Sequence, residues 1–294
     1  ISVSAFLLNR SSDLLVDVGS TKMDWIAYDG NAVFQRFTTE GFNPNYSERQ
    51  RLDSLVEYVK THHLVCRPND IQSVHYYGTG CGYGPNCRLI KDVFQQYFPN
   101  AEIDVNHDLM AACHALLGHE KGIACILGTG SNACVYDGES IVERAVSLGY
   151  IVGDEGSGMH IGKELVRAYF YHFMPEDLRY EFKATYNLEL DDFLDNVYHK
   201  GQPSKYVAAF AQFADKNRTH PYIQELVKAC FKAFVEAFIL CFEQSKSMKI
   251  CLVGSVAFVF RDFLKESLAN YGLTMGEVIQ APADGLMRYY GIKT

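Results

Sequence analysis

Two short turns rich in glycine and hydroxyl residues carry the clearest chemical signal in this 294-residue sequence. Each follows an apolar run: LLVDVGSTK covers residues 14–22 and ACILGTGSN covers residues 124–132. A strand that ends in such a turn presents backbone N–H groups and a hydroxyl, which form a concavity suited to phosphate. Two such turns could grip one triphosphate from both sides. The predicted phosphate-binding residues are Gly19, Ser20, Thr21, Lys22, Gly128, Thr129, Gly130 and Ser131.

Two aspartates stand next to strand ends. Asp17 precedes the first turn, where a carboxylate would repel phosphate unless a cation lay between them, so its position indicates Mg²⁺ held through water. Asp108 begins a helix at the strand tips, where ligands of α/β proteins bind, and we interpret it as a catalytic base. Each also has a purely structural interpretation, as the cap of a turn or of a helix. Lys22 could equally be a solvated lysine at a strand end.

An acidic loop, GDEGSG at residues 153–158, lies just before a predicted helix. Its carboxylates, Asp154 and Glu155, are directed acceptors that suit a polyhydroxyl ligand such as a sugar. A surface turn would use the same residue types. The sequence therefore leaves a sugar contact and an ordinary turn as alternatives at this loop.

Further candidates for ligand contact lie at other strand ends. Gly254 and Ser255 form a strand-to-helix junction that is expected to contact the nucleotide. Asn43 and the loop that starts at Gly78 are candidates for contact with the phosphate acceptor, with loop formation as the alternative. The candidate substrate contacts are Asn43, Gly78, Asp108, Asn132, Asp154 and Glu155.

The elements that must position these residues repeat along the chain. After the two turns, residues 29–42 read DGNAVFQRFTTEGF and residues 137–150 read DGESIVERAVSLGY, with Asp, Gly, Arg and a later Gly in register. Both halves therefore predict a strand, a phosphate turn, a strand, an Asp-Gly hairpin and a strand.

Strands and helices alternate after the first hairpin, which predicts parallel sheet with crossover helices. We place a domain boundary near Gly118, with domains at 1–118 and 119–281 and a closing helix that packs back on the first domain. The apolar stripe of a helix at 222–244 is expected to be core, with a homodimer face as the alternative. Helices are predicted at 47–62 behind a Ser cap, 88–97, from 108, 222–244, 257–270 and 282–290, and further strands at 71–77, 102–105 and 249–253.

Composition excludes several classes of function. A net charge of −8 disfavours binding to nucleic acid. No apolar run is long enough to span a membrane, and the nine scattered cysteines suggest free thiols in a reducing cytoplasm. Cys81 and Cys87 lack a second Cys/His pair nearby, so we do not expect a zinc site. Residues 1–12 have no basic region before their apolar patch and are interpreted as a scar or start-site artefact rather than a signal peptide.

Taken together, five segments resemble the sugar-kinase/Hsp70/actin superfamily, and within it the BadF/BadG type of ATPase domain to which N-acetylglucosamine kinase belongs. The segments follow one another in the family's order over most of the chain. They are DVGSTKMDW (17–25), NHDLMAAC (106–113), LGTGSNA (127–133), GDEGSG (153–158) and LVGSVA (252–257). The resemblance implies an α/β protein with two ribonuclease-H-like (actin-like ATPase) domains around a cleft that takes ATP and Mg²⁺.

The resemblance also implies roles: Asp108 takes the proton of the acceptor hydroxyl, Asp17 positions the metal, and Asp154 with Asn43 contacts the sugar. The expected activity is an ATP-dependent kinase that phosphorylates the 6-hydroxyl of N-acetylglucosamine or N-acetylmuramic acid. One alternative is an ATPase activator of a radical dehydratase with an Fe–S cluster, which would require closely placed cysteines. Another is a non-catalytic sensor of sugar and nucleotide.

Overall fold

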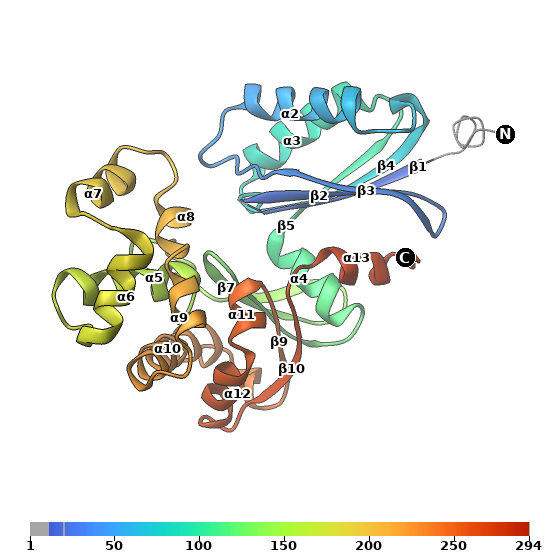
Figure 1. Ribbon diagram of the computed structural model, residues 1–294. Coiled ribbons are helices and arrows are strands. Elements are labelled where there is room, and N and C mark those ends of the chain that lie inside the picture. The colour runs from blue at the N-terminus through green and yellow to red at the C-terminus, as the bar shows by residue number, and fades with distance from the viewer. Residues whose placement is uncertain (1–11, 20, 294) are drawn as a thin grey trace. The chain divides into compact units, whose positions relative to one another are not determined.

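The computed structural model describes residues 12–19 and 21–293. Of the segment 1–12 interpreted as a start-site artefact, residues 1–11 therefore lie outside the described residues, as do Ser20 and Thr294, while Ser12 begins the first strand. The chain divides into two compact units (Figure 1). One comprises the chain up to Ala115 together with the segment from Pro282 onward, and the other is Leu116–Ala281.

The first unit contains a mixed five-stranded sheet in the order β3-β2-β1-β4-β5. β1 pairs antiparallel with β2, and β2 with β3, while β1, β4 and β5 run parallel. The strands are β1 (Ser12–Val18), β2 (Lys22–Asp29), β3 (Ala32–Glu40), β4 (Ile71–Gly78) and β5 (Glu102–His107). Because β1, β4 and β5 are parallel, their carboxyl ends lie at the same edge of the sheet.

Helices cover both faces of this sheet. Figure 1 shows α2 (Arg49–His62) and α3 (Gly84–Tyr97) on one face, with α4 (Asp108–Leu117) and α13 (Ala283–Tyr289) on the other. The predicted Ser cap of α2 is wrong, because Glu48 is the N-cap residue and no side chain caps this end. α3 begins four residues before the predicted start, with a proline in its first turn, where proline needs no N–H partner.

The C-terminal helix α13 is held against α4 and β4 by polar and steric contacts. The Tyr77 hydroxyl lies 2.7 Å from the Tyr290 hydroxyl and 2.7 Å from Nδ1 of His114. Gly285 packs so closely on Ala115 that a Cβ atom there would lie 2.5 Å from the Ala115 carbonyl oxygen. Only glycine therefore permits this approach of the two helices.

The second unit contains a five-stranded sheet of the same design, in the order β10-β9-β6-β7-β8. β6, β7 and β8 form an antiparallel meander, and β6, β9 and β10 run parallel. The strands are β6 (Gly122–Leu127), β7 (Ser131–Tyr136), β8 (Ile141–Arg144), β9 (Lys249–Val253) and β10 (Thr274–Ile279). The predicted repeat is therefore present in the structure and extends from the hairpins to all five strands.

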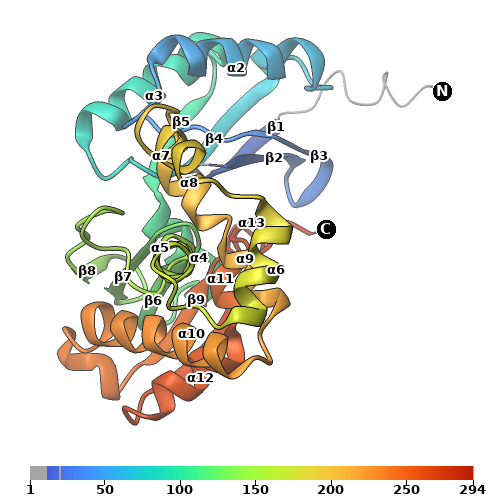
Figure 2. The same cartoon turned by 60° about the vertical axis from the view of Figure 1, so that its left-hand side comes forward.

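Between β8 and β9 the second unit is mainly helical, and Figure 2 shows this part from another side. The predicted helix at 222–244 ends early, because α10 gives way to a π-helical turn (Val235–Ile239) and then to a 3₁₀ turn (Glu243–Lys246). The predicted helix at 257–270 is two helices that break at Phe260. The helices are α5 (Gly158–Phe170), α6 (Glu176–Tyr186), α7 (Leu190–Tyr198), α8 (Pro203–Ala208), α9 (Ala211–Lys216), α10 (Pro221–Phe234), α11 (Ser255–Val259) and α12 (Arg261–Ala269).

Each unit has its own apolar core. Trp25, Phe94 and Phe98 are fully buried in the first, and Phe182, Phe231 and Phe234 in the second. The apolar stripe of α10 is part of the second core, as predicted. None of the helices in the described part of the chain combines the length and apolarity that crossing a bilayer demands.

Candidate functional site

The first unit gathers its predicted site segments at one edge of its sheet. Val18, Gly78 and His107 are successive neighbours across β1, β4 and β5. Adjacent strands lie about 4.8 Å apart, so the ends of β1 and β5 are separated by roughly 10 Å. The turn after β1 contacts the segments that follow β3 and β4, because the Gly41 N–H donates to the Thr21 carbonyl (3.1 Å) and the Thr79 N–H to the Val18 carbonyl (3.2 Å).

A pair of carboxylates lies beside the first turn. Asp17 on β1 faces Asp24 on β2 in the strand register, and Asp24 is only 4% exposed. Asp24 is stabilised by Nζ of Lys22 at 2.7 Å and by the Thr38 hydroxyl at 2.7 Å. Burial, followed by the charge of Asp24, raises the pKa of Asp17 to about 7. A carboxylate held in this way gains from a nearby cation.

Within the first turn, the Gly19 N–H donates a hydrogen bond to the Lys22 carbonyl (2.9 Å). Thr21 is exposed, and the Lys22 ammonium, predicted as a phosphate contact, is ion-paired with Asp24. Among residues 12–19 and 21–293 no group of three or more His, Cys, Asp or Glu side chains could hold a metal ion. A Mg²⁺ ion at Asp17 would thus take most of its ligands from water and phosphate, which is the coordination that this ion favours.

Asp108 is the first residue of α4 and is half-buried. Its Oδ1 accepts the adjacent N–H of Leu109 at 2.9 Å. The capping bond to the third N–H of the helix is made by His107 instead, whose Nδ1 accepts from Met110 at 3.1 Å. The helix therefore does not need Asp108 for that capping bond, which weakens the alternative that Asp108 is only a cap.

The loops after β3 and β4 meet beside these residues. A Cβ atom on Gly80, which has φ of +78°, would lie 3.0 Å from Oδ1 of Asn43. That oxygen accepts the Asn45 N–H at 3.0 Å, an Asx turn that leaves the amide NH₂ of Asn43 as its donor group. Gly78 lies against the Tyr76 ring, where a Cβ atom would be 2.5 Å from Cε1.

In the second unit the acidic loop braces the second phosphate turn. The backbone N–H groups of Gly158 and Met159, at the start of α5, donate to the carbonyls of Gly128 (2.8 Å) and Thr129 (3.1 Å). Oδ1 of Asp154 accepts the Ser131 N–H at 3.3 Å. A Cβ atom on Gly130 would lie 2.8 Å from Oδ2 of Asp154, so the turn and the carboxylate are in direct contact.

Asp154 adopts a backbone conformation that L-residues disfavour, with φ of +61°. Burial raises the pKa of its carboxyl, an effect opposed by the Ser131 hydrogen bond. Ser157 caps α5 by accepting the His160 N–H (3.2 Å), and Nδ1 of His160 accepts the Gly156 N–H (2.9 Å). The loop that carries the strained Asp154 backbone is thus fixed to the start of α5, and such strain is characteristic of functional loops. Glu155, its neighbour, is half-buried.

The junction after β9 reaches the same turn. Gly254 has φ of +135°, and a Cβ atom there would lie 2.3 Å from the Leu127 carbonyl oxygen and 3.0 Å from the Gly128 nitrogen. Ser255 follows as an exposed residue. In the turn, the Ser131 hydroxyl is buried without a hydrogen-bond partner among the described residues, and Oδ1 of Asn132 accepts the Ala133 N–H at 2.9 Å. An unpartnered buried hydroxyl at a phosphate turn is an observation in favour of a ligand there.

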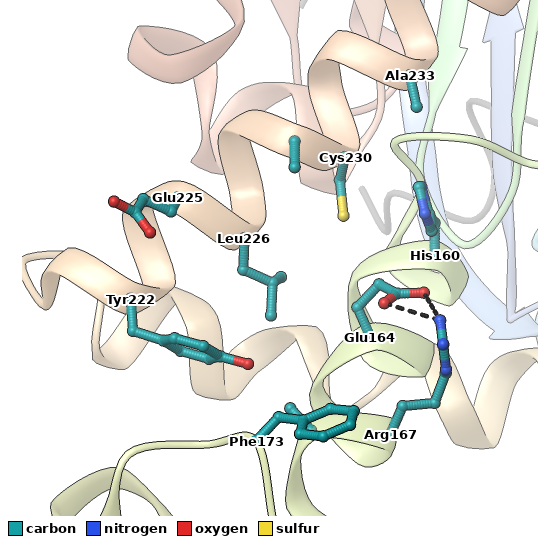
Figure 3. A pocket seen from close by; sticks show the side chains of 11 residues that line it. His160, Glu164, Arg167, Phe173, Tyr222, Glu225, Leu226, Cys230 and Ala233 are labelled. Atoms are coloured by element: carbon teal, nitrogen blue, oxygen red, sulfur yellow. Dashed lines mark hydrogen bonds and ion pairs between the residues drawn. The ribbon is translucent and has the colours of Figure 1, made fainter. Parts of the chain in front are cut away.

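A pocket of about 410 Å³ lies behind the acidic loop, between α5 and α10 (Figure 3). His160 and Cys230 line it, and Glu164 and Arg167 form an ion pair at 2.8 Å on one side. None of the residues predicted from sequence to bind a ligand line this pocket.

Sequence reasoning missed three residues that the structure brings to these sites. Asp24 lies inside an apolar strand, where its spacing of seven residues from Asp17 gave no signal before the register of β1 and β2 was known. His107 accepts a helix N–H through its Nδ1, and His160 accepts a loop N–H in the same way. The adjacent Asn-His-Asp run before α4 was the only local hint of a capping residue other than aspartate.

The chain is similar to a family model and to solved structures. The BadF/BadG/BcrA/BcrD ATPase family matches residues 16–285. A protein from Porphyromonas gingivalis, provisionally assigned as an N-acetylglucosamine kinase, is 33% identical with a TM-score of 0.87, and the match covers 95% of this chain and 98% of that one. A search of curated proteins finds no match.

Two further structures share the fold at lower identity. One, from Chromobacterium violaceum and also provisionally assigned as an N-acetylglucosamine kinase, has a TM-score of 0.68 at 16% identity, with 96% and 99% of the two chains covered. The other, a ROK hexokinase from Thermus thermophilus, has a TM-score of 0.50 at 16% identity, with 95% and 97% covered. The predicted α/β class with two ribonuclease-H-like, actin-like ATPase sheets is confirmed. With a family match over nearly its whole length and a relative at 33% identity, the protein belongs to the BadF/BadG/BcrA/BcrD ATPase family.

Proposed function

We propose that this protein is an ATP-dependent kinase that transfers a phosphoryl group to the 6-hydroxyl of an N-acetylated hexosamine, either N-acetylglucosamine or N-acetylmuramic acid. The observation that carries the proposal is the edge of the first sheet, where a phosphate-type turn, the Asp17–Asp24 pair and Asp108 lie at neighbouring strand ends. Phosphoryl transfer needs these three functions: phosphate contacts, a place for a cation and a group that receives the proton of the acceptor.

Asp108 is the general base of the proposal. It accepts the proton of the acceptor hydroxyl and orients the oxygen for attack. Its support is positional: it follows β5 at the same edge as the first turn, and the helix it begins is capped by His107. Asn43 offers its amide NH₂ to the acceptor from the adjacent loop.

The turns supply contacts to the phosphates of ATP. Backbone N–H groups of the two turns and the hydroxyls of Thr21, Thr129 and Ser131 are the donors, and Ser131 is the best supported because its buried hydroxyl lacks a partner among the described residues. When bound, Mg²⁺ neutralises part of the phosphate charge. Asp17 holds the ion through water, which fits its raised pKa beside Asp24. Gly254 and Ser255 contact the nucleotide from the end of β9.

The acceptor class rests on the acidic loop and on similarity. Asp154 keeps Oδ2 for a ligand hydroxyl while Oδ1 accepts from Ser131, and Glu155 is half-buried beside it. The P. gingivalis protein, which is 33% identical to this chain, is provisionally assigned as an N-acetylglucosamine kinase. The nine cysteines are all free thiols, which fits a reducing compartment, so we place the enzyme in the cytoplasm.

A coupled assay of ADP release against a panel of sugars tests the proposal. We expect turnover with N-acetylated hexosamines and none with their 6-deoxy analogues, because the 6-hydroxyl is the acceptor. Asp104→Asn is the matched control for Asp108→Asn: Asp104 lies on β5, four residues before Asp108, but is exposed and accepts from Asn106. ADP release that no sugar stimulates would reject the kinase in favour of an ATPase activator, and sugar binding without turnover would favour a sensor.

A further inference from the structure

The loop between β4 and α3 carries two cysteines in contact. Cys81 is 4% exposed, and Cys87 is half-buried in the first turn of α3. The Cys87 thiol donates a hydrogen bond to the Cys81 carbonyl at 2.7 Å, and the two thiol side chains also interact with each other. Residues 82–85 between them are exposed, so small reagents can reach this loop.

This cysteine pair lies against the residues proposed to bind the acceptor. Asn86, next to Cys87, donates to Oδ1 of Asn45 (2.8 Å) and to the Gly80 carbonyl (2.9 Å). Gly80 in turn contacts Asn43. Asp108 is close enough to Cys81 for its charge to act on the thiol. A movement of the two cysteines would therefore be transmitted to the Asn43 loop by Asn86.

A buried hydroxyl without a hydrogen bond lies beside the pair. The Tyr76 hydroxyl, which is buried and interacts electrostatically with both cysteines, has no hydrogen-bond partner among the described residues. An unpartnered buried hydroxyl is costly, so this arrangement of the loop leaves a hydrogen bond unmade beside the two cysteines.

We propose that Cys81 and Cys87 form a reversible disulfide that switches the acceptor-binding loop between an active dithiol and a less active oxidised state. Disulfide formation needs the two Cβ atoms at about 3.8 Å. The Cys87 sulfur already lies 2.7 Å from the Cys81 carbonyl oxygen, so the two residues are direct neighbours. The exchange removes the Cys87 bond to the Cys81 carbonyl and draws the start of α3 toward the loop. Asn86 moves with the start of α3, which changes its hydrogen bonds to Asn45 and Gly80.

The oxidant is a low-molecular-weight disulfide such as oxidised glutathione. Cys87, the more exposed thiol, attacks one sulfur of the reagent after losing its proton, which forms a mixed disulfide and releases one equivalent of reduced thiol. Cys81 then attacks the Cys87 sulfur and releases the second equivalent, so two protein thiols are oxidised while one reagent disulfide is reduced to two thiols. Burial raises the pKa of Cys81, so this second step is the slow one.

The test equilibrates the full-length protein with glutathione at a series of reduced-to-oxidised ratios. Alkylation followed by peptide mapping measures the Cys81–Cys87 disulfide without reference to activity. The same samples are assayed for sugar-dependent ADP release, and dithiothreitol is added to test reversal. Cys87→Ser keeps a hydroxyl donor for the Cys81 carbonyl but cannot form the disulfide, and Cys241→Ser removes an exposed cysteine of the second unit as the matched control.

We expect a mapped Cys81–Cys87 disulfide, while the buried strand cysteines Cys125, Cys134 and Cys251 remain thiols. Acceptor kcat/KM should fall by about 10- to 100-fold on oxidation, since small misplacements of positioning loops have effects of that size. Dithiothreitol should restore the kcat/KM of the oxidised protein. Cys87→Ser should keep its kcat/KM under oxidation, while Cys241→Ser should lose activity as the wild type does.

Absence of the disulfide at every ratio overturns the proposal, as does unchanged kcat/KM in protein shown by mapping to be oxidised. Equal inactivation of Cys87→Ser also overturns it. The effect on turnover rests on the proposed function, but a protein without kinase activity would fail the assay in its reduced state too. In that case the mapped disulfide and a changed rate of proteolysis at residues 82–85 on oxidation still test the switch, and unchanged proteolysis would reject it.

Discussion

Replacing Asp17 by Asn should stabilise the unliganded protein while removing its activity. Burial and the neighbouring Asp24 raise the pKa of Asp17 from 3.8 to about 7. The unfolded chain therefore ionises this group at lower pH than the folded chain does. Between these two pKa values the folded state binds more protons than the unfolded state. The contribution of Asp17 to the free energy of unfolding is therefore complete below pH 3.8 and is lost as the pH rises to about 7.

Each pKa unit corresponds to about 1.4 kcal/mol, so the rise of about three units sets an upper limit near 4 kcal/mol. The side chain of Asp17 is only half-buried, so screening by solvent brings the expected free-energy difference below this limit. Asn has the same shape without the charge, and its contribution does not titrate. The stability advantage of Asp17→Asn over wild type should therefore grow by roughly 2 kcal/mol between about pH 5 and about pH 8.

Urea unfolding at these two pH values measures the difference. Trp25 is the single tryptophan of the sequence and is fully buried in the first unit, so its fluorescence reports on the unit that contains Asp17. Asp92→Asn, an exposed aspartate on α3, is the control and should change the unfolding free energy by less than about 0.5 kcal/mol. An advantage that does not grow with pH, or an Asp17→Asn variant that keeps full Mg²⁺-dependent activity, would refute the reasoning.

Two further substitutions test the contacts that shape each unit. Gly254→Ala introduces a Cβ atom 2.3 Å from a backbone oxygen at φ of +135°, and should lower the free energy of unfolding by about 3–5 kcal/mol. The control Gly272→Ala, at a glycine with positive φ but open surroundings, should lower it by about 1 kcal/mol. Circular dichroism during urea unfolding compares them, and equal costs would contradict the close approach of β9 to the second turn. Tyr77→Phe removes the hydroxyl between α4, β4 and α13 and should lower the free energy of unfolding by about 1–3 kcal/mol. Tyr83→Phe, at an exposed ring, should leave it unchanged. An unchanged free energy of unfolding in Tyr77→Phe would show that this network does not hold α13.

The sequence was informative where structure is set locally. Apolar strands that end in Gly-Ser/Thr turns and return through Asp-Gly hairpins predicted the meanders β1-β2-β3 and β6-β7-β8, because hairpin pairing depends on residues close in sequence.

Contacts between distant segments were not predictable in this way. Asp154 was recognised as an acidic loop residue, but its contact with Ser131 spans 23 positions and depends on where α5 begins. Asp24 becomes a partner of Asp17 only through strand register. The single helix expected at 222–244 shows a periodic apolar stripe, and periodicity alone does not reveal the π-helical turn at Val235–Ile239.

The most direct measurement of the central claim follows the phosphorus atom itself. Phosphorus NMR of a reaction with ATP, Mg²⁺ and N-acetylglucosamine should show the γ-phosphate signal replaced by a sugar phosphomonoester attached at the 6-oxygen. Asp108→Asn should form that product about 10²- to 10⁴-fold more slowly, with ATP affinity retained, because it lacks the group that takes the hydroxyl proton. Inorganic phosphate as the only product, or a sugar phosphate formed by Asp108→Asn at the wild-type rate, would contradict the account.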